Sequence, residues 1–396
     1  MTAPPGAGTA TYLSERVLAV RPSGIRRFFD LAAEMDEVIS LSIGEPDFTT
    51  PEPLIRAAVS ALEAGETHYT SNAGMTELRT AVCARLQELY GVRYDPAGEI
   101  LITVGASEAV DAALRAVLDP GDEVIYHEPC FVAYAPLITF AGGTPVAVAT
   151  TERTDFRVTA HQIERAITPR TKALFLAYPS NPTGAVLDEA ELTDIAAVAE
   201  RHDLVVVTDE IYDRLTYGGH RHVAFSALPG ARDRTVLIGG FSKSYAMTGW
   251  RIGYVCAPRD LMTGIAKVHQ YGIMCAPTAA QFAALEALRS GEPYLADMLA
   301  EYDRRRRLMT DRFNQIGLTC FEPRGAFYCF PRIAGTGLSS DDFAERLLLE
   351  ERVAVVPGGA FGPSGEGYVR VCYAAAYDDI VEAMDRIERF VGRLRS

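Results

Sequence analysis

Short apolar segments alternate with helix-like segments over most of the chain, and this alternation limits the fold more than any other feature. Several of the apolar segments are rich in Val and Ile, as is typical of strands buried on both faces. We expect seven strands, at residues 100–104, 123–127, 144–149, 173–177, 204–208, 235–238 and 251–256. Helical patterns lie between or after them, at 108–117, 189–202 and 279–289. Strands that alternate with helices pair mostly in parallel, so the sequence predicts an α/β fold built on a mostly parallel seven-stranded sheet.

The pattern changes near Tyr294. From there on we expect a long charged helix, two short strands, a second helix and a further apolar strand, at 295–316, 319–321, 327–330, 341–350 and 353–356. This mixture is typical of a separate, smaller α+β domain, and the segment before Gly44 is too short to fold by itself. We therefore predict an N-terminal arm that joins the small domain at 1–46, a large domain at 47–290 and a small C-terminal domain at 291–396.

Charge and cysteine content exclude several classes of function. The 396 residues include 52 acidic and 38 basic side chains, and the net charge of -14 opposes binding to nucleic acids or anionic membranes. The four arginines at 304–307 follow acidic residues in a helical segment, which predicts a solvated, ion-paired helix face. Seven cysteines without a CxxC pair favour reduced thiols. Without a signal-like start or an apolar run of about 18 residues, the sequence predicts a cytoplasmic protein that acts on small molecules.

Lys243 and Arg251 lie eight residues apart in a stretch rich in small side chains. An amine can condense with an aldehyde while a guanidinium holds a phosphate, and pyridoxal 5'-phosphate (PLP) carries both groups. Lysine and arginine are common residues, so this spacing alone is equally compatible with an exposed pair of charges. Polar residues at other strand ends decide between the two interpretations.

Three further polar groups follow predicted strands, where catalytic side chains of parallel sheets gather. Gly105, Ala106 and Ser107 open a helix, so their N–H groups can hold a phosphate. Asn181 lies in a polar turn and can donate to a phenolate oxygen. Asp209 follows a buried valine strand, where a protonated pyridine nitrogen would offset the cost of burying its charge. Each group has a structural alternative, a simple turn or a helix N-cap, but their order along the chain is more specific than any one of them.

Six motifs resemble those of the class I aminotransferases, which have the fold of PLP-dependent transferases of fold type I. They are SIGEPDF (42–48), HYTSNAGMTELR (68–79), YPSNPTG (178–184), TDEIYDRL (208–215), GFSKSYAMTGWRIGY (240–254) and GEGYVRVCYA (365–374). The resemblance covers nearly the whole chain after the first dozen residues. Within the family the chain is most similar to the aromatic amino acid aminotransferases, on RPSGIRRFFDLAA near the start and PCFVAYAP in the middle.

The resemblance implies roles for the residues that would hold PLP. Lys243 would carry the cofactor covalently and then move a proton, while Asp209 would keep its ring nitrogen protonated. Asn181 and Tyr212 would hydrogen-bond the ring hydroxyl oxygen, and Phe131 would stack on the ring. Lys243, Asp209 and Tyr212 are thus the predicted catalytic residues. The phosphate would be held by Gly105, Ala106, Ser107, Ser242 and Arg251, and by Tyr69 of the partner subunit, which requires a homodimer.

Substrate binding is implied in the same way. Arg370 would hold the substrate α-carboxylate in a bidentate fork, with Asn181 and the Gly44 backbone assisting. Ile25 would line an apolar pocket, for which Tyr271 and Met274 are further candidates. The aspartate-specific members use an extra arginine for a second, distal carboxylate, and we identify none in the sequence. With the resemblance to the aromatic branch, an aromatic amino donor with 2-oxoglutarate as acceptor is favoured. One position departs from the family pattern, since Gly240 stands where many relatives carry serine.

Other interpretations share these residues. An aspartate or alanine aminotransferase, or a β-lyase, would use the same lysine, aspartate and arginine. A non-catalytic PLP sensor would need a DNA-binding domain, which the acidic balance and the short segment before Gly44 disfavour. His220 and His222 could suggest a metal, but no further ligand lies near them in sequence. We therefore predict a polar loop there and no metal site.

Overall fold

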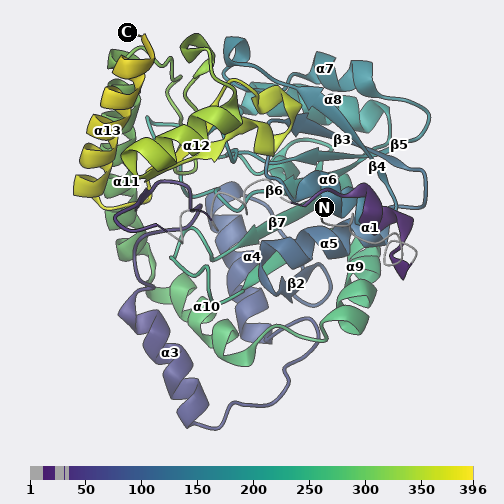
Figure 1. The fold of residues 1–396 in the computed structure, drawn as a ribbon. Helices are drawn as coiled ribbons and strands as arrows, with labels where there is room; N and C mark the ends of the chain where they lie inside the picture. Colours follow the sequence, from purple (N-terminus) through teal and green to yellow (C-terminus); the bar gives the residue numbers. More distant parts are fainter. Residues whose placement is uncertain (1–11, 23–30, 32–34, 396) are drawn as a thin grey trace.

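The computed structural model describes residues 12–22, 31 and 35–395, and a seven-stranded sheet lies at its centre (Figure 1). All seven predicted strands are present: β2 (Ile100–Thr103), β3 (Glu123–Glu128), β4 (Thr144–Ala149), β5 (Thr171–Leu176), β6 (Val205–Asp209), β7 (Thr235–Gly240) and β8 (Gly253–Cys256). Their order is β2-β8-β7-β6-β5-β3-β4. β8 runs antiparallel to both of its neighbours, and the other pairs are parallel. The prediction of a mostly parallel α/β sheet is confirmed.

The described helices include the three predicted between the strands and the long charged helix after them. They are α1 (Glu15–Ala19), α3 (Glu52–Glu63), α4 (Thr76–Tyr90), α5 (Gly105–Val117), α6 (Tyr134–Phe140), α7 (Ala160–Ala166), α8 (Glu189–Arg201), α9 (Arg259–Gly272), α10 (Thr278–Ser290), α11 (Glu292–Gln315), α12 (Ser340–Glu351) and α13 (Tyr377–Arg395). None of these is long and apolar enough to cross a membrane.

Helices cover both faces of the sheet, because successive side chains of a strand point to opposite sides. Leu101 of β2 packs in a cluster with α5, α6 and α9, whereas Ile100 and Ile102 pack in a cluster with α3, α4 and α10. Farther along the sheet, α7 and α8 cover β5 and β6. Burial on both faces explains the continuous apolar run of β6.

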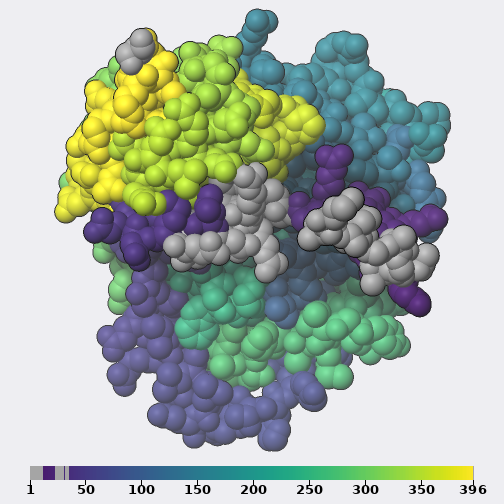
Figure 2. Space-filling model, in the orientation of Figure 1, coloured from purple at the N-terminus to yellow at the C-terminus, as the bar shows by residue number. Residues whose placement is uncertain are grey.

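A second apolar core lies beside this sheet, where α11, α12 and α13 pack together (Figure 1). It includes a three-stranded antiparallel sheet in the order β11 (Val356–Pro357), β12 (Val369–Cys372), β9 (Tyr328–Cys329). β1 (Ile39–Ser40) pairs in parallel with β10 (Val353–Ala354), and Figure 2 shows the N-terminal segment directly against the C-terminal part of the chain. This pairing supports a small domain made of both chain ends. Its boundaries at 46 and 291 stay predictions.

The strand expected at 319–321 is wrong. No strand forms there, because the side chain of Asn314 at the end of α11 occupies both backbone groups of Cys320. Asn314 Oδ1 accepts from the Cys320 N–H at 3.0 Å, and Asn314 Nδ2 donates to the Cys320 carbonyl at 2.9 Å. The segment is thereby held as a loop against α11.

The arginine run on α11 is ion-paired as predicted, but two of its four members are not solvated. Arg305 and Arg306 are 5% and 3% exposed. Arg305 donates to both carboxylate oxygens of Asp47 at 2.9 Å, and Arg306 donates to Glu322 at 2.7 Å. Each buried guanidinium is therefore neutralised by a carboxylate from another segment, and Arg305 fastens the 42–48 motif to α11.

Candidate active site

A cavity of about 410 Å³ lies at the carboxyl ends of the central strands, a size typical of small-molecule sites. Asp209 ends β6, Lys243 follows β7, and Asn181 follows β5. Arg251 precedes β8, and because β8 is antiparallel, the start of this strand lies at the same edge of the sheet. The cavity brings together these predicted residues: Gly44, Ala106, Ser107, Phe131, Asn181, Asp209, Tyr212, Ser242, Lys243, Arg251 and Arg370.

Lys243 is the lysine that this cavity contains. The sequence has three lysines, and Lys172 and Lys267 are exposed on the surface. The Lys243 Nζ donates to the Gly44 carbonyl oxygen at 2.6 Å. Burial lowers the pKa of Lys243 to about 8, with the nearby Arg370 and Arg251 charges acting in the same direction and Cys372 and Glu45 opposing them. A substantial fraction of the amine is therefore neutral near pH 8 and able to attack an aldehyde.

Asp209 is a buried carboxyl group with two hydrogen-bond donors. The Tyr134 hydroxyl donates to Oδ2 at 2.9 Å, and the Ile211 N–H donates to Oδ1 at 3.1 Å. Burial raises the pKa of Asp209 to about 6 although both hydrogen bonds act to lower it. A cation beside this carboxyl would stabilise its charged form, and the protonated ring nitrogen of PLP is such a cation.

Arg251 lies against the first turn of α5, where the phosphate was predicted. Gly105 begins the helix with a φ of +75°, and a Cβ at this residue would lie 2.6 Å from Nη2 of Arg251. Only glycine combines this backbone conformation with this close approach. The α5 N-terminus has no side-chain cap, and Ser107 and Ser242 line the cavity beside it. Free helix N–H groups, two hydroxyls and a guanidinium fit a phosphate.

Arg370 forms the opposite part of the cavity. It lies in β12 and is 4% exposed. Its Nη1 donates to Asn181 Oδ1 at 3.0 Å, and its Nη2 donates to the Ser42 carbonyl oxygen. Its buried Nε has no hydrogen-bond partner among the described residues. A guanidinium that is fixed at two points and still has donors to offer fits the carboxylate of a substrate.

The cavity combines a lysine, an aspartate, an arginine and a helix N-terminus that fits a phosphate. Comparison with known proteins identifies the family to which a chain with these groups belongs. The model of the family "Aminotransferase class I and II" matches residues 36–387. The chain belongs to this family. It is therefore a PLP-dependent aminotransferase of fold type I, and its substrates are amino acids and 2-oxo acids.

Relatives of this aminotransferase differ in the substrate that their names state. The chain is 46% identical to the aspartate aminotransferase of Pyrococcus abyssi, over 95% of this chain and 97% of the relative. It is 45% identical to aromatic-amino-acid aminotransferase 2 of Thermococcus litoralis, again over 95% and 97%. The crystal structure of the aromatic aminotransferase from Pyrococcus horikoshii superposes with a TM-score of 0.89 at 44% identity, covering 94% and 100% of the two chains. Family membership alone does not decide between these donors.

Five predicted residues lie outside the cavity of this aminotransferase protomer or outside the described residues. One of them, Gly105, does not line the cavity but lies directly beside Arg251, which does. Ile25 is not among the described residues. Tyr69 is 80% exposed and Tyr271 is 87% exposed, and neither lines the cavity of its own protomer. Met274 is also on the surface, where its carbonyl accepts from Asn72 Nδ2 at 2.7 Å. This bond ties the loop that carries Tyr69 to the segment that carries Met274.

Two tyrosines that line the cavity and contact predicted site residues were not predicted from the sequence. Tyr134 begins α6 and donates to Asp209, while Tyr328 in β9 contacts both Tyr212 and Arg370. For Tyr134 a signal was available, because it lies one helical turn after Phe131 in the motif that follows β3. For Tyr328 no such signal was available, because its apolar neighbours predict an ordinary buried strand.

The departure at Gly240 has a steric explanation. A Cβ on this residue would lie 2.8 Å from Cδ1 of Ile211 and 3.3 Å from the Gly253 Cα on the neighbouring strand. A serine would therefore clash unless both neighbours moved. In this aminotransferase, the cavity hydroxyl next to Lys243 is that of Ser242.

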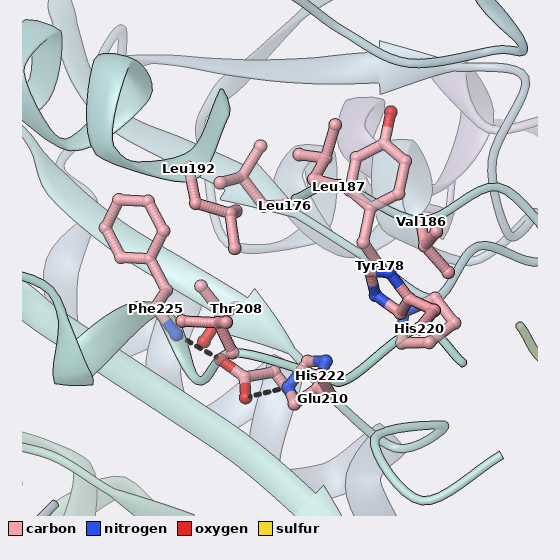
Figure 3. A pocket seen from close by; sticks show the side chains of 12 residues that line it. Leu176, Tyr178, Val186, Leu187, Leu192, Thr208, Glu210, His220, His222 and Phe225 are labelled. Carbon is pink, nitrogen blue, oxygen red and sulfur yellow. Dashed lines mark hydrogen bonds and ion pairs between the residues drawn. The ribbon is translucent and has the colours of Figure 1, made fainter. Parts of the chain in front are cut away.

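His220 and His222 lie in a loop, as expected, but His222 is paired rather than solvated (Figure 3). Its Nε2 lies 2.7 Å from Glu210 Oε2, and the Phe225 N–H donates to Glu210 Oε1 at 3.1 Å. Burial opposes protonation of His222, yet the Glu210 carboxylate raises its pKa above the ordinary value. Over the described ranges, no group of three metal-ligating side chains is found. His222 and the Phe225 N–H are therefore the hydrogen-bond partners of Glu210, the residue next to Asp209.

The pKa of Lys243 leads to a testable expectation for cofactor uptake. The rate at which cofactor-free protein binds PLP covalently should rise with pH through about 8, because only the neutral amine attacks the aldehyde. Stopped-flow absorbance from pH 7 to 10 measures this rate. The range lies above pH ~6, where the phosphate of PLP itself titrates. Lys267→Ala should give the same profile. A midpoint near the ordinary lysine value of 10.5 would contradict the lowered pKa.

Proposed function

We propose that this aminotransferase moves the α-amino group of an aromatic amino acid to 2-oxoglutarate in a ping-pong reaction. The observation that carries the proposal is that Lys243, with a pKa of about 8, and the buried Arg370 face the same cavity. One supplies an amine for the cofactor, and the other supplies donors for a substrate carboxylate. Apolar side chains of Ile43, Leu137 and Phe131 also line the cavity, which supports an uncharged donor side chain.

Bound PLP supplies an electron sink that stabilises negative charge at the substrate α-carbon. The proposed work of the chain is to hold, orient and move protons around it. With PLP bound, Lys243 Nζ would accept the substrate α-proton as general base and later donate a proton as general acid. Asp209 holds the proton at the ring nitrogen, and Tyr134 orients Asp209 through its 2.9 Å hydrogen bond. Without the Asp209 charge, the ring nitrogen would lose its proton and the sink would weaken.

The remaining proposed roles concern position. Phe131 would stack on the ring of bound PLP, and Asn181 and Tyr212 would donate hydrogen bonds to its hydroxyl oxygen. Gly105, Ala106, Ser107, Ser242 and Arg251 hold the phosphate at the N-terminus of α5. Tyr69 of the partner subunit would complete this phosphate site in a homodimer. The high exposure of Tyr69 in the isolated protomer supports this assignment.

Arg370 and the Gly44 backbone hold the substrate at the other end of the cavity. Fixing the α-carboxylate places the bond to the α-proton against Lys243, which lies 2.6 Å from the Gly44 carbonyl. The donor side chain would lie against the apolar wall of the cavity, where Ile25 of the N-terminal arm is proposed to contribute.

Single-donor half-reactions test this proposal. The PLP-loaded protein is mixed with one amino acid at a time, without any 2-oxo acid, and its visible absorbance is followed. Bleaching by phenylalanine or tyrosine, with one equivalent of the matching 2-oxo acid formed, is expected. Bleaching by aspartate or alanine alone would contradict the aromatic specificity, and pyruvate and ammonia from a β-substituted donor without bleaching would indicate a lyase. Recovery of the band with 2-oxoglutarate, but not with pyruvate, identifies the acceptor.

Arg370→Lys should lower kcat/KM for the amino donor by roughly 10- to 100-fold with PLP still bound. A lysine keeps the positive charge and one hydrogen bond but loses the second of the two parallel bonds, and one charge-assisted bond contributes about 1.5–3 kcal/mol. Steady-state kinetics together with the visible spectrum of the bound cofactor measures both effects. The proposed role would be refuted by unchanged kcat/KM, and a loss of PLP would show that Arg370 serves the cofactor instead.

A further inference from the structure

Tyr328 connects two parts of the cavity that the proposed function treats separately. It is fully buried in β9, and its strand pairs with β12, which carries Arg370. Its hydroxyl lies 2.8 Å from the Tyr212 hydroxyl. Its ring faces the guanidinium of Arg370, with 4.6 Å between the ring centroid and Cζ. One side chain therefore contacts both the phenol proposed to serve the cofactor and the arginine proposed to hold the substrate.

The Tyr328 hydroxyl occupies the space that a side chain at residue 44 would need, and this residue is a glycine. A Cβ on Gly44 would lie 2.5 Å from the Tyr328 hydroxyl oxygen and 3.5 Å from Arg370 Nη1. The φ of Gly44 is not in the left-handed region, so this glycine is required by contact and not by backbone conformation. The Gly44 carbonyl also accepts the hydrogen bond from Lys243 Nζ. Tyr328 is thus packed against the backbone segment that both Lys243 and Arg370 use.

Proton counting gives the hydrogen bond between the two tyrosines a direction. Each phenol has one proton, and burial raises the pKa of both Tyr212 and Tyr328, so both stay protonated. In the proposed function, the Tyr212 hydroxyl donates a hydrogen bond to the ring oxygen of the cofactor and keeps its proton. Tyr328 must then be the donor to Tyr212. A hydroxyl that accepts one hydrogen bond becomes a stronger donor in the next.

The ring of Tyr328 acts on Arg370 independently of the hydroxyl. Asn181 and the Ser42 carbonyl fix the two Nη atoms, and the rings of Tyr328 and Phe361 lie 4.6 and 5.0 Å from Cζ. A guanidinium near aromatic rings in a buried site is stabilised by cation–π attraction. The rings therefore hold the fork in one orientation while leaving its remaining N–H groups free for a carboxylate.

We propose that Tyr328 is a positioning residue with two separable roles: its hydroxyl strengthens the hydrogen bond from Tyr212 to the cofactor oxygen, and its ring orients Arg370 for the substrate carboxylate. This proposal rests on the roles proposed above for Tyr212 and Arg370. Tyr328 exchanges no atoms with the substrate, so removing each half of its side chain should affect a different measurement.

The hydroxyl is tested with Tyr328→Phe in the PLP-loaded protein. A ring oxygen that receives a weaker hydrogen bond attracts the proton on the neighbouring Lys243 nitrogen more strongly when that nitrogen is joined to the cofactor. The nitrogen therefore keeps its proton up to a higher pH. The pH midpoint of the visible absorbance change should therefore rise by roughly 0.2 to 0.5 units, since only part of one hydrogen bond is transmitted through Tyr212. Affinity for 3-phenylpropionate and for maleate, two carboxylates without an amino group, should stay within about twofold by calorimetry. An unchanged midpoint would overturn the role of the hydroxyl.

The ring is tested with Tyr328→Leu, which should raise the midpoint in the same way and also weaken both carboxylates by roughly two- to fivefold. Phe361→Leu is the matched control, because it removes the other ring beside Arg370 and should weaken the carboxylates without moving the midpoint. If Tyr328→Leu does not fold, Tyr328→Met replaces it as the variant without a ring. The role of the ring would be overturned if this variant bound the two carboxylates as tightly as Tyr328→Phe does.

Arg370→Lys separates failure of this proposal from failure of the proposed function. If Arg370→Lys weakens both carboxylates and removal of the Tyr328 ring does not, only the role of Tyr328 is wrong. If Arg370→Lys leaves their affinity unchanged, the carboxylate site itself is wrong, and the inference about the Tyr328 ring is refuted with it.

Discussion

Lys243→Ala is expected to abolish covalent cofactor binding and to lower the transamination rate by at least roughly 10⁴-fold. The variant loses both the amine that joins the cofactor and the base that moves the α-proton. Lys243 is the lysine of the cavity, whereas Lys172 and Lys267 are exposed. Neither of the other two lysines can therefore replace it.

Borohydride reduction followed by peptide mapping is the direct measurement for Lys243. The wild-type protein should carry the reduced cofactor on the peptide containing Lys243, and Lys243→Ala should carry none. Lys172→Ala and Lys267→Ala serve as controls that should retain both the modification and full activity. A modified peptide in Lys243→Ala, or transamination at more than about one hundredth of the wild-type rate, would remove the central assignment.

Asp209→Asn is expected to lower kcat on the order of 10³-fold while the fold and Lys243 stay intact, because the variant keeps the shape of the side chain and loses its charge. Asp209 has neutral donors in Tyr134 and Ile211, and burial raises its pKa to about 6 although these hydrogen bonds and the Lys243 charge act to lower it. The neutral amide could not keep the ring nitrogen protonated, and proton abstraction from the substrate would slow. Single-turnover bleaching with the preferred donor isolates that step from product release.

Tyr134→Phe provides the graded comparison for Asp209. It removes one hydrogen bond of 2.9 Å and leaves the carboxylate charge, so kcat should fall only about five- to tenfold. A primary isotope effect with α-deuterated donor should increase in Asp209→Asn if proton abstraction has become limiting. Equal losses in both variants would show that Asp209 acts by position and not by charge.

The pattern of strands and the site residues that follow them could be predicted because both depend on local sequence. The seven strands of the large sheet are short and mostly apolar. Asp209 ends one of them, and Asn181 and Lys243 lie within a few residues of the ends of two others. Once the strands pair in parallel, their carboxyl ends meet at one edge, so residues far apart in sequence line one cavity. The family motifs added Arg370, which lies in a β12 strand that gives no chemical signal by itself.

Contacts between distant segments could not be predicted, because nothing local specifies them. The strand expected at 319–321 failed because Asn314 occupies the backbone groups that a strand partner would have used. Arg305 and Arg306 were expected in solvent, but Asp47 and Glu322 reach them from other parts of the chain and allow them to be buried. In each case a side chain outside the local pattern decided the outcome.

The sequence by itself determined the alternation of strands and helices, the lysine and aspartate at strand ends, and the family. Periodicity and motif spacing carry that information, since side-chain direction along a strand or helix is fixed by backbone geometry. Only the tertiary structure decided that Tyr134 contacts Asp209, that Tyr328 lies between Tyr212 and Arg370, and that Gly44 must lack a side chain. These are contacts across 75, 116, 42 and 284 residues of sequence, and packing of the two apolar cores, rather than local preference, sets their distances.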